Sequence, residues 1–127
     1  MNRTAWVLQV LLGIYFVATG VIHLVVPDGL PDVMTWMYDL STPLHWIAGL
    51  AEIAGGLGLV IPAATRIAPR LTPLAASGLV VVMLSAAVWH ATRGELQSIV
   101  GNLVVALLLT FVAYVRFRLH PIEAAAS

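Results

Sequence analysis

The sequence contains no cysteine and no lysine, and it has few charges of either sign. Without cysteine, the chain cannot form a disulfide, bind a metal through thiolates or carry out dithiol redox chemistry. Six basic and six acidic residues cancel to a formal charge of zero, so nucleic-acid binding has no electrostatic support. Charged residues make up only 9% of the chain, against about 25% in soluble domains. These absences indicate a membrane protein.

Hydrophobic residues make up 61% of the 127 residues and gather in four long stretches. A helix of about 20 apolar residues is long enough to cross the hydrocarbon core of a bilayer. The stretches predict four transmembrane helices, over residues 5–26, 43–61, 73–92 and 96–115. We therefore predict an all-α fold, an integral membrane four-helix bundle that forms a single membrane domain over residues 1–127.

Proline and glycine mark the expected ends of these helices. Thr72 followed by Pro73 predicts the N-cap and first turn of the third helix. Pro62 is expected to close the second helix, and Gly94 the third. The first apolar stretch is too long for a signal peptide and lacks a cleavage site, so we expect it to be retained as a helix.

The arginines are distributed unequally between the two sides of the predicted bundle. Cytoplasmic loops of membrane proteins carry an excess of basic residues. Only Arg93 lies on one side, between the third and fourth helices. We therefore predict that both termini are cytoplasmic. The five arginines on that side are Arg3, Arg66, Arg70, Arg116 and Arg118.

The connection between the first two helices contains three aspartates and no basic residue. Within residues 31–40, Val33, Trp36, Met37 and Leu40 follow helical spacing, which predicts a short helix. Trp and Tyr favour the headgroup level of a membrane, so we expect this helix to be an interfacial anchor. A second interpretation is a lid over a pocket on the outer face, because long loops are often functional.

Glu52 lies near the middle of the second apolar stretch. An ionisable side chain at that depth costs roughly 3 kcal/mol or more, so it requires a partner, a cavity or a function. His45, Gly49 and Gly56 fall on the same helical face as Glu52. That face is therefore expected to point into the bundle.

Other polar residues lie at a similar depth. With both termini cytoplasmic, His23 and His90 lie near the outer ends of the first and third helices, and Asn102 lies about two turns into the fourth. We expect these residues to gather in the outer half of the bundle and the inner half to be nearly featureless. The predicted ligand-binding residues are Glu52, His23, His90, Asn102 and His45.

Three interpretations of this cluster remain open. It could be a hydrogen-bonded network that only fixes helix packing, since polar contacts are ordinary in membrane bundles. It could form a pocket for a quinone or a similar apolar ligand. Imidazole and carboxylate also suit zinc, copper or iron. However, the candidate ligands lack the i, i+4 spacing of a metal-binding helix, so we predict no metal.

The sequence reads FVATG at 16–20, AEIAGGLG at 51–58, AVWH at 87–90 and NL at 102–103. These segments together resemble the DoxX-like family of small four-helix bacterial membrane proteins. The resemblance covers about residues 12–116. His23 stands where many relatives have lysine.

The resemblance implies a multi-pass protein of the plasma (inner) membrane. It also implies that the function could be one of several, because proteins of this family have different roles. These roles include a quinone-linked thiosulfate-oxidising system, membrane redox assemblies that handle oxidative stress, and receptor assembly. We carry two hypotheses. One is an accessory or quinone-interacting subunit of a membrane redox system, in contact with lipid, a quinone and a redox partner protein. The other is a non-catalytic scaffold or assembly factor. Catalytic residues and enzymatic activity stay open.

Overall fold

The computed structural model describes residues 1–126 and consists of helices. The long helices are α1 (Asn2–Val25), α2 (Thr42–Thr65), α3 (Leu71–Thr92) and α4 (Leu96–Tyr114). A short 3-10 helix, η1 (Asp32–Asp39), follows α1, and a π-helical turn, η2 (Val115–Leu119), continues α4. Each long helix is long and apolar enough to cross a membrane, the fourth over Leu96–Leu119. The predicted all-α membrane bundle is confirmed, and no strand occurs within residues 1–126.

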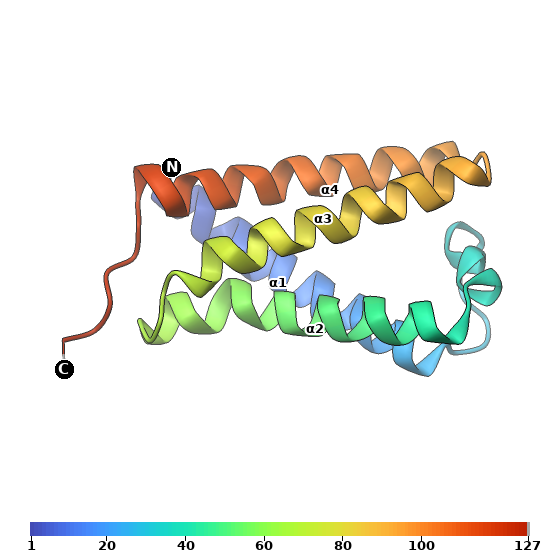
Figure 1. The fold of residues 1–127 in the computed structure, drawn as a ribbon, viewed down its shortest axis with the longest axis horizontal. Coiled ribbons are helices and arrows are strands. Elements are labelled where there is room, and N and C mark those ends of the chain that lie inside the picture. Colours follow the sequence, from blue (N-terminus) through green and yellow to red (C-terminus); the bar gives the residue numbers. More distant parts are fainter. Residues whose placement is uncertain (127) are drawn as a thin grey trace.

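Both termini lie at the same end of the bundle, together with the connection between α2 and α3 (Figure 1). The short helix η1 and the turn between α3 and α4 lie at the opposite end. We call these the termini end and the η1 end. Helix α1 packs along α2, α3 packs along α4, and α2 also contacts α3, whereas α1 and α4 touch little. The bundle is thus two helix pairs joined mainly through α2 and α3.

Two pairs of glycines allow α1 and α2 to approach closely. A Cβ atom at Gly20 would lie 2.7 Å from the carbonyl oxygen of Gly49, and one at Gly13 would lie 3.0 Å from that of Gly56. Small residues at such positions let membrane helices pack backbone to backbone. His23 lies one turn beyond Gly20, so the close approach brings it beside α2.

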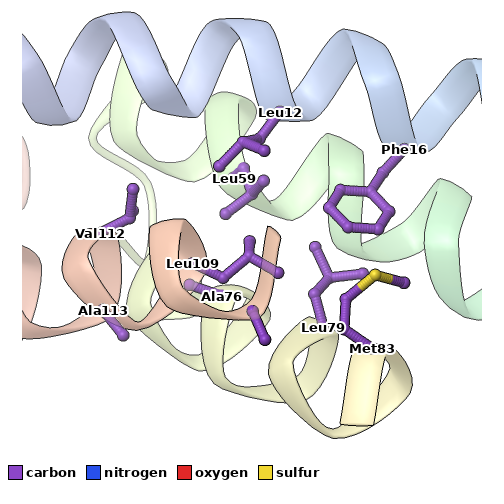
Figure 2. Packing of buried hydrophobic residues seen from close by; sticks show 10 residues of the cluster. Leu12, Phe16, Leu59, Ala76, Leu79, Met83, Leu109, Val112 and Ala113 are labelled. Atoms are coloured by element: carbon purple, nitrogen blue, oxygen red, sulfur yellow. The ribbon is translucent and has the colours of Figure 1, made fainter. Parts of the chain in front are cut away.

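Apolar side chains fill the part of the bundle nearer the termini end. Figure 2 shows Leu12 and Phe16 of α1 pointing toward Leu59 of α2 and Leu79 of α3. Leu109 of α4 completes this centre and, like Leu59, is fully buried. The core therefore joins all four helices. It does not extend to the η1 end of the bundle.

Two boundary predictions were wrong, and one contact explains both. Pro62 lies inside α2, which continues to Thr65. Because proline has no N–H, the carbonyl of Gly58, four residues earlier, loses its helical donor. The hydroxyl of Thr72 donates to that carbonyl at 3.1 Å. Thr72 is therefore a partner for the proline-interrupted helix and not an N-cap, a position that Arg70 occupies.

The other boundaries follow the expected chemistry. Helix α3 ends at Thr92, and Gly94 beyond it has a φ of 69°, a left-handed conformation that favours glycine. The predicted short helix over 31–40 is present as the 3-10 helix η1. Helix α1 begins at Asn2, three residues earlier than expected.

Candidate functional site

A cavity of about 760 Å³ lies between the helices at the η1 end. Side chains from all four long helices and from η1 line it, and most of them are apolar. This volume falls in the usual range of small-molecule pockets. Four of the predicted site residues, His23, Glu52, His90 and Asn102, line the cavity. The fifth, His45, lies behind His23 and contacts it.

His23 and Glu52 face each other where α1 approaches α2. Nε2 of His23 lies 3.5 Å from Oε2 of Glu52, and both side chains are only 6% exposed. The other ring nitrogen of His23, Nδ1, lies 2.9 Å from Nδ1 of His45. Nε2 of His45 lies 2.7 Å from the carbonyl oxygen of Met37 in η1. A continuous row of polar atoms therefore runs from the cavity wall to η1.

A second row begins at His90 on the opposite helix pair. Nδ1 of His90 lies 3.0 Å from Oε1 of Glu95, which also accepts a 2.7 Å hydrogen bond from Nε of Arg93. Nη2 of Arg93 donates to Asp39 at 2.7 Å. This row ties the turn between α3 and α4 to the end of η1.

These contacts change the acid–base properties of the two charged residues in the turn. Hydrogen bonds from Arg93, and then from His90, lower the pKa of the Glu95 carboxyl. Hydrogen bonds to Glu95 and Asp39 raise the pKa of Arg93. Glu95 is therefore a carboxylate at neutral pH and acts only as a hydrogen-bond acceptor.

Aromatic side chains close the cavity at the η1 end. The ring of Trp36 in η1 lies edge-on to His90 at a centroid distance of 4.7 Å. It also lies 5.8 Å from His23 and 5.9 Å from Trp89. Helix η1 therefore covers the cavity, the position that the lid interpretation requires. Whether η1 also anchors the protein at the membrane interface stays a prediction.

Two polar atoms of the site have no hydrogen-bond partner within residues 1–126. They are Oε2 of Glu52 and Nδ2 of Asn102, and both are buried. A buried polar group without a partner costs about 1–3 kcal/mol, so each one in a native protein requires an explanation, such as a water molecule, an ion or a functional role. The cavity wall therefore holds an acceptor, 3.5 Å from Nε2 of His23, and a donor, neither of which has a hydrogen bond within residues 1–126.

A second buried polar cluster lies at the termini end, where the sequence predicts almost none. Nε of Arg116 donates to Gln9 at 2.6 Å, and its Nη1 donates to Asn2 at 2.7 Å. Gln9 in turn donates to the carbonyl of Leu59 at 2.7 Å. The guanidinium also lies over the ring of Trp6, 5.1 Å from its centroid. We call Asn2, Gln9 and Arg116 the termini-end cluster.

The prediction of a featureless inner half was therefore wrong. Arg116 is only 3% exposed, because η2 continues α4 and keeps the side chain inside the bundle. One residue in the sequence did indicate a polar cluster at this end. Gln9 is a lone amide in a long apolar stretch, and such a residue needs a hydrogen-bond partner on another helix.

The chemistry of the cavity wall suits the polar end of an otherwise apolar molecule. Imidazole, carboxylate and amide groups reach the wall from all four long helices, and aliphatic and aromatic side chains supply the rest. Within residues 1–126, no group of three or more His, Asp or Glu side chains is arranged to hold a metal ion.

Comparison with known proteins gives a single result. A model of the DoxX-like family matches residues 7–112, a range that includes the four predicted residues on the cavity wall. No curated protein and no solved structure matches the chain. Together with the four apolar helices, the match makes this a multi-pass membrane protein in contact with the lipid bilayer. The chain belongs to the DoxX-like family.

Proposed function

We propose that the protein binds a quinone in the cavity at the η1 end and serves as an accessory subunit of a membrane redox system. One observation carries this proposal. The buried atoms Oε2 of Glu52 and Nδ2 of Asn102 have no partner within residues 1–126, and both residues line an apolar cavity of about 760 Å³. A cluster that served packing alone would be expected to leave fewer of its polar atoms beside open space.

The composition of the wall fits a quinone head group. Such a head group is an apolar ring with oxygen atoms on opposite sides, and its tail is soluble in lipid. Nδ2 of Asn102 would donate to one oxygen, and Glu52 with His23 would accept from the other when that oxygen carries a proton. Trp36 would cover the ring. When bound, a quinone supplies a carrier of two electrons and two protons.

We also infer that the η1 end faces the outside of the plasma membrane. Five of the six arginines lie at or near the termini end. The sixth, Arg93, pairs with Glu95 and Asp39 at the η1 end. Basic residues accumulate on the cytoplasmic side, which supports cytoplasmic termini. A quinone-binding cavity would then open in the outer half of the bilayer.

The experiment is native mass spectrometry of the protein taken gently from its own membrane, with released small molecules identified. We expect one quinone or quinol per chain in the wild type and its loss in Glu52→Gln. Thr110→Val is the matched control, because the hydroxyl of Thr110 donates only to Ala106 of its own helix and lies outside the cavity wall. Circular dichroism checks that each variant is folded. A wild type that carries only phospholipid, or nothing, would overturn the proposal.

A second candidate function is a scaffold or assembly factor. Two observations favour it. The rows of contacts from His45 to Met37 and from Arg93 to Asp39 tie η1 to both helix pairs. A second hollow of about 690 Å³ runs along α1 and α2 and is lined wholly by apolar residues, as a partner helix would require. The same experiment separates the two, because a scaffold retains no stoichiometric quinone and Glu52→Gln would only lower its stability.

A further inference from the structure

The contacts of His45 determine which of its ring nitrogens carries the proton. A carbonyl oxygen can only accept, so Nε2 of His45 donates to Met37. His45 is buried and has no carboxylate within ion-pair distance in the part of the chain that the structure describes. A buried cation without such a partner is costly, so the ring is neutral. Its Nδ1 is therefore an acceptor.

This arrangement sets the tautomer of His23 in turn. Because Nδ1 of His45 accepts, Nδ1 of His23 must be the donor across the 2.9 Å contact. A neutral His23 then has no proton on Nε2, which faces Oε2 of Glu52 at 3.5 Å. The imidazole therefore brings no proton to this contact. In either protonation state of the carboxyl, lone pairs of the two groups remain for a ligand.

His90 also carries its proton on Nδ1, but a different partner holds it there. The carboxylate of Glu95 accepts from Nδ1 of His90 at 3.0 Å, so this nitrogen is protonated. In the neutral form of the His90 ring, Nε2 carries no proton and is also an acceptor. Two hydroxyls on the wall are also acceptors toward the cavity, because their protons are already used. Thr19 donates to Phe16 and Ser85 donates to Val81, each within its own helix.

Donors on the wall lie mainly on α4 and on the two tryptophans. Asn102 offers Nδ2, and Gln97 and Ser98 stand near the beginning of the same helix, α4. The indole N–H groups of Trp36 and Trp89 can only donate. Tyr15, the remaining titratable group on the wall, has a hydroxyl that can serve in either role. The wall formed by α1, α2 and α3 therefore presents mostly acceptors.

We propose that the cavity selects the reduced, hydroxyl-bearing form of its ligand, a hydroquinone in preference to a quinone. This inference rests on the proposed function and concerns the same site. A hydroquinone can donate a hydroxyl to Glu52 or to His90 and accept from Asn102. A quinone only accepts, so its oxygens would face the lone pairs of the wall. His45 is a positioning residue, because it acts only by holding the tautomer of His23.

The first test measures affinity with three matched probes and the full chain in lipid nanodiscs. They are tetramethylhydroquinone kept reduced without oxygen, tetramethylbenzoquinone, and 1,4-dimethoxytetramethylbenzene, which cannot donate. We expect the hydroquinone to bind at least about tenfold more tightly than either other probe, the worth of one good hydrogen bond. Equal or tighter binding of the quinone overturns this inference alone. Binding of none of the three overturns the proposed function as well.

The second test reads the tautomers directly, by ¹⁵N NMR of the histidine-labelled protein, which contains four imidazoles. We expect the proton on Nδ1 in His23 and His90, and on Nε2 in His45. His45→Phe should release the tautomer of His23 and reduce the probe selectivity to less than about threefold. His120→Phe, at an exposed position of the termini end, should change neither. A proton on Nε2 of His23 in the wild type would overturn the inference.

Discussion

The two ends of this bundle use buried polar side chains in opposite ways. At the termini end, Gln9 and Arg116 bond to each other, to Asn2 and to backbone carbonyls, and within residues 1–126 only Nη2 of Arg116 is buried there without a partner. At the η1 end, Glu52 and Asn102 stand on the wall of a large cavity, and each keeps a polar atom without a partner within residues 1–126. The first arrangement joins helices, and the second leaves bonding capacity for another molecule.

This difference predicts opposite responses to substitution. When a hydrogen-bonded group is removed, its buried partner is left unsatisfied, and the full desolvation cost appears as lost stability. When an unsatisfied group is replaced by an apolar one, that cost disappears. Stability measurements can therefore separate a packing role from a binding role, although both clusters look alike in the sequence.

The largest effect is expected at the termini end. Gln9→Leu removes the acceptor for Nε of the buried Arg116 and the donor for the carbonyl of Leu59. Because a buried charge then loses a partner, we expect the free energy of unfolding to fall by about 2–4 kcal/mol. The measurement is reversible unfolding in mixed micelles. Thr110→Val is the control, since Thr110 bonds only within its own helix. A loss of less than about 0.5 kcal/mol would show that Gln9 does not join the helices.

A smaller effect is expected from acid at the η1 end. The pKa of Glu95 is lower in the folded protein than in the unfolded chain, chiefly because Arg93 donates to it. Its contribution to stability is therefore fully present above the unfolded pKa, near 4.3, and is lost as the pH falls through the folded pKa. Melting temperatures between pH 7 and pH 3 should show a decline that is shallower in Glu95→Gln. Parallel curves for the two proteins would contradict this account.

The sequence predicts the fold well and the polar contacts only in part. Long apolar stretches with few charges determine the four spans, because no other structure satisfies the backbone in lipid. The depth of Glu52, His23 and His90 places them at one end, because helical rise converts sequence position into depth. The depth of a residue does not say which side chain it will contact on another helix. The hydrogen bond from His45 to Met37 and the size of the cavity therefore could not be predicted.

The errors have a common physical origin. From the sequence, Arg116 predicts only a cytoplasmic charge, because the positive-inside rule says nothing about which side chains turn inward. Pro62 predicts a helix end, although membrane helices tolerate proline when another group satisfies the freed carbonyl. Here Thr72 does so, from a helix that begins only after the next turn of the chain. Both cases depend on contacts between helices, which a single segment does not reveal.

The most direct test of the central claim is one variant with two readouts. Asn102→Leu replaces an amide whose Nδ2 has no partner in the described part of the chain. We predict that its melting temperature equals or exceeds that of the wild type, while the quinone retained per chain falls at least about tenfold. A clear loss of stability with no change in bound quinone would contradict the account, because it would show that this residue, like Gln9, serves helix packing.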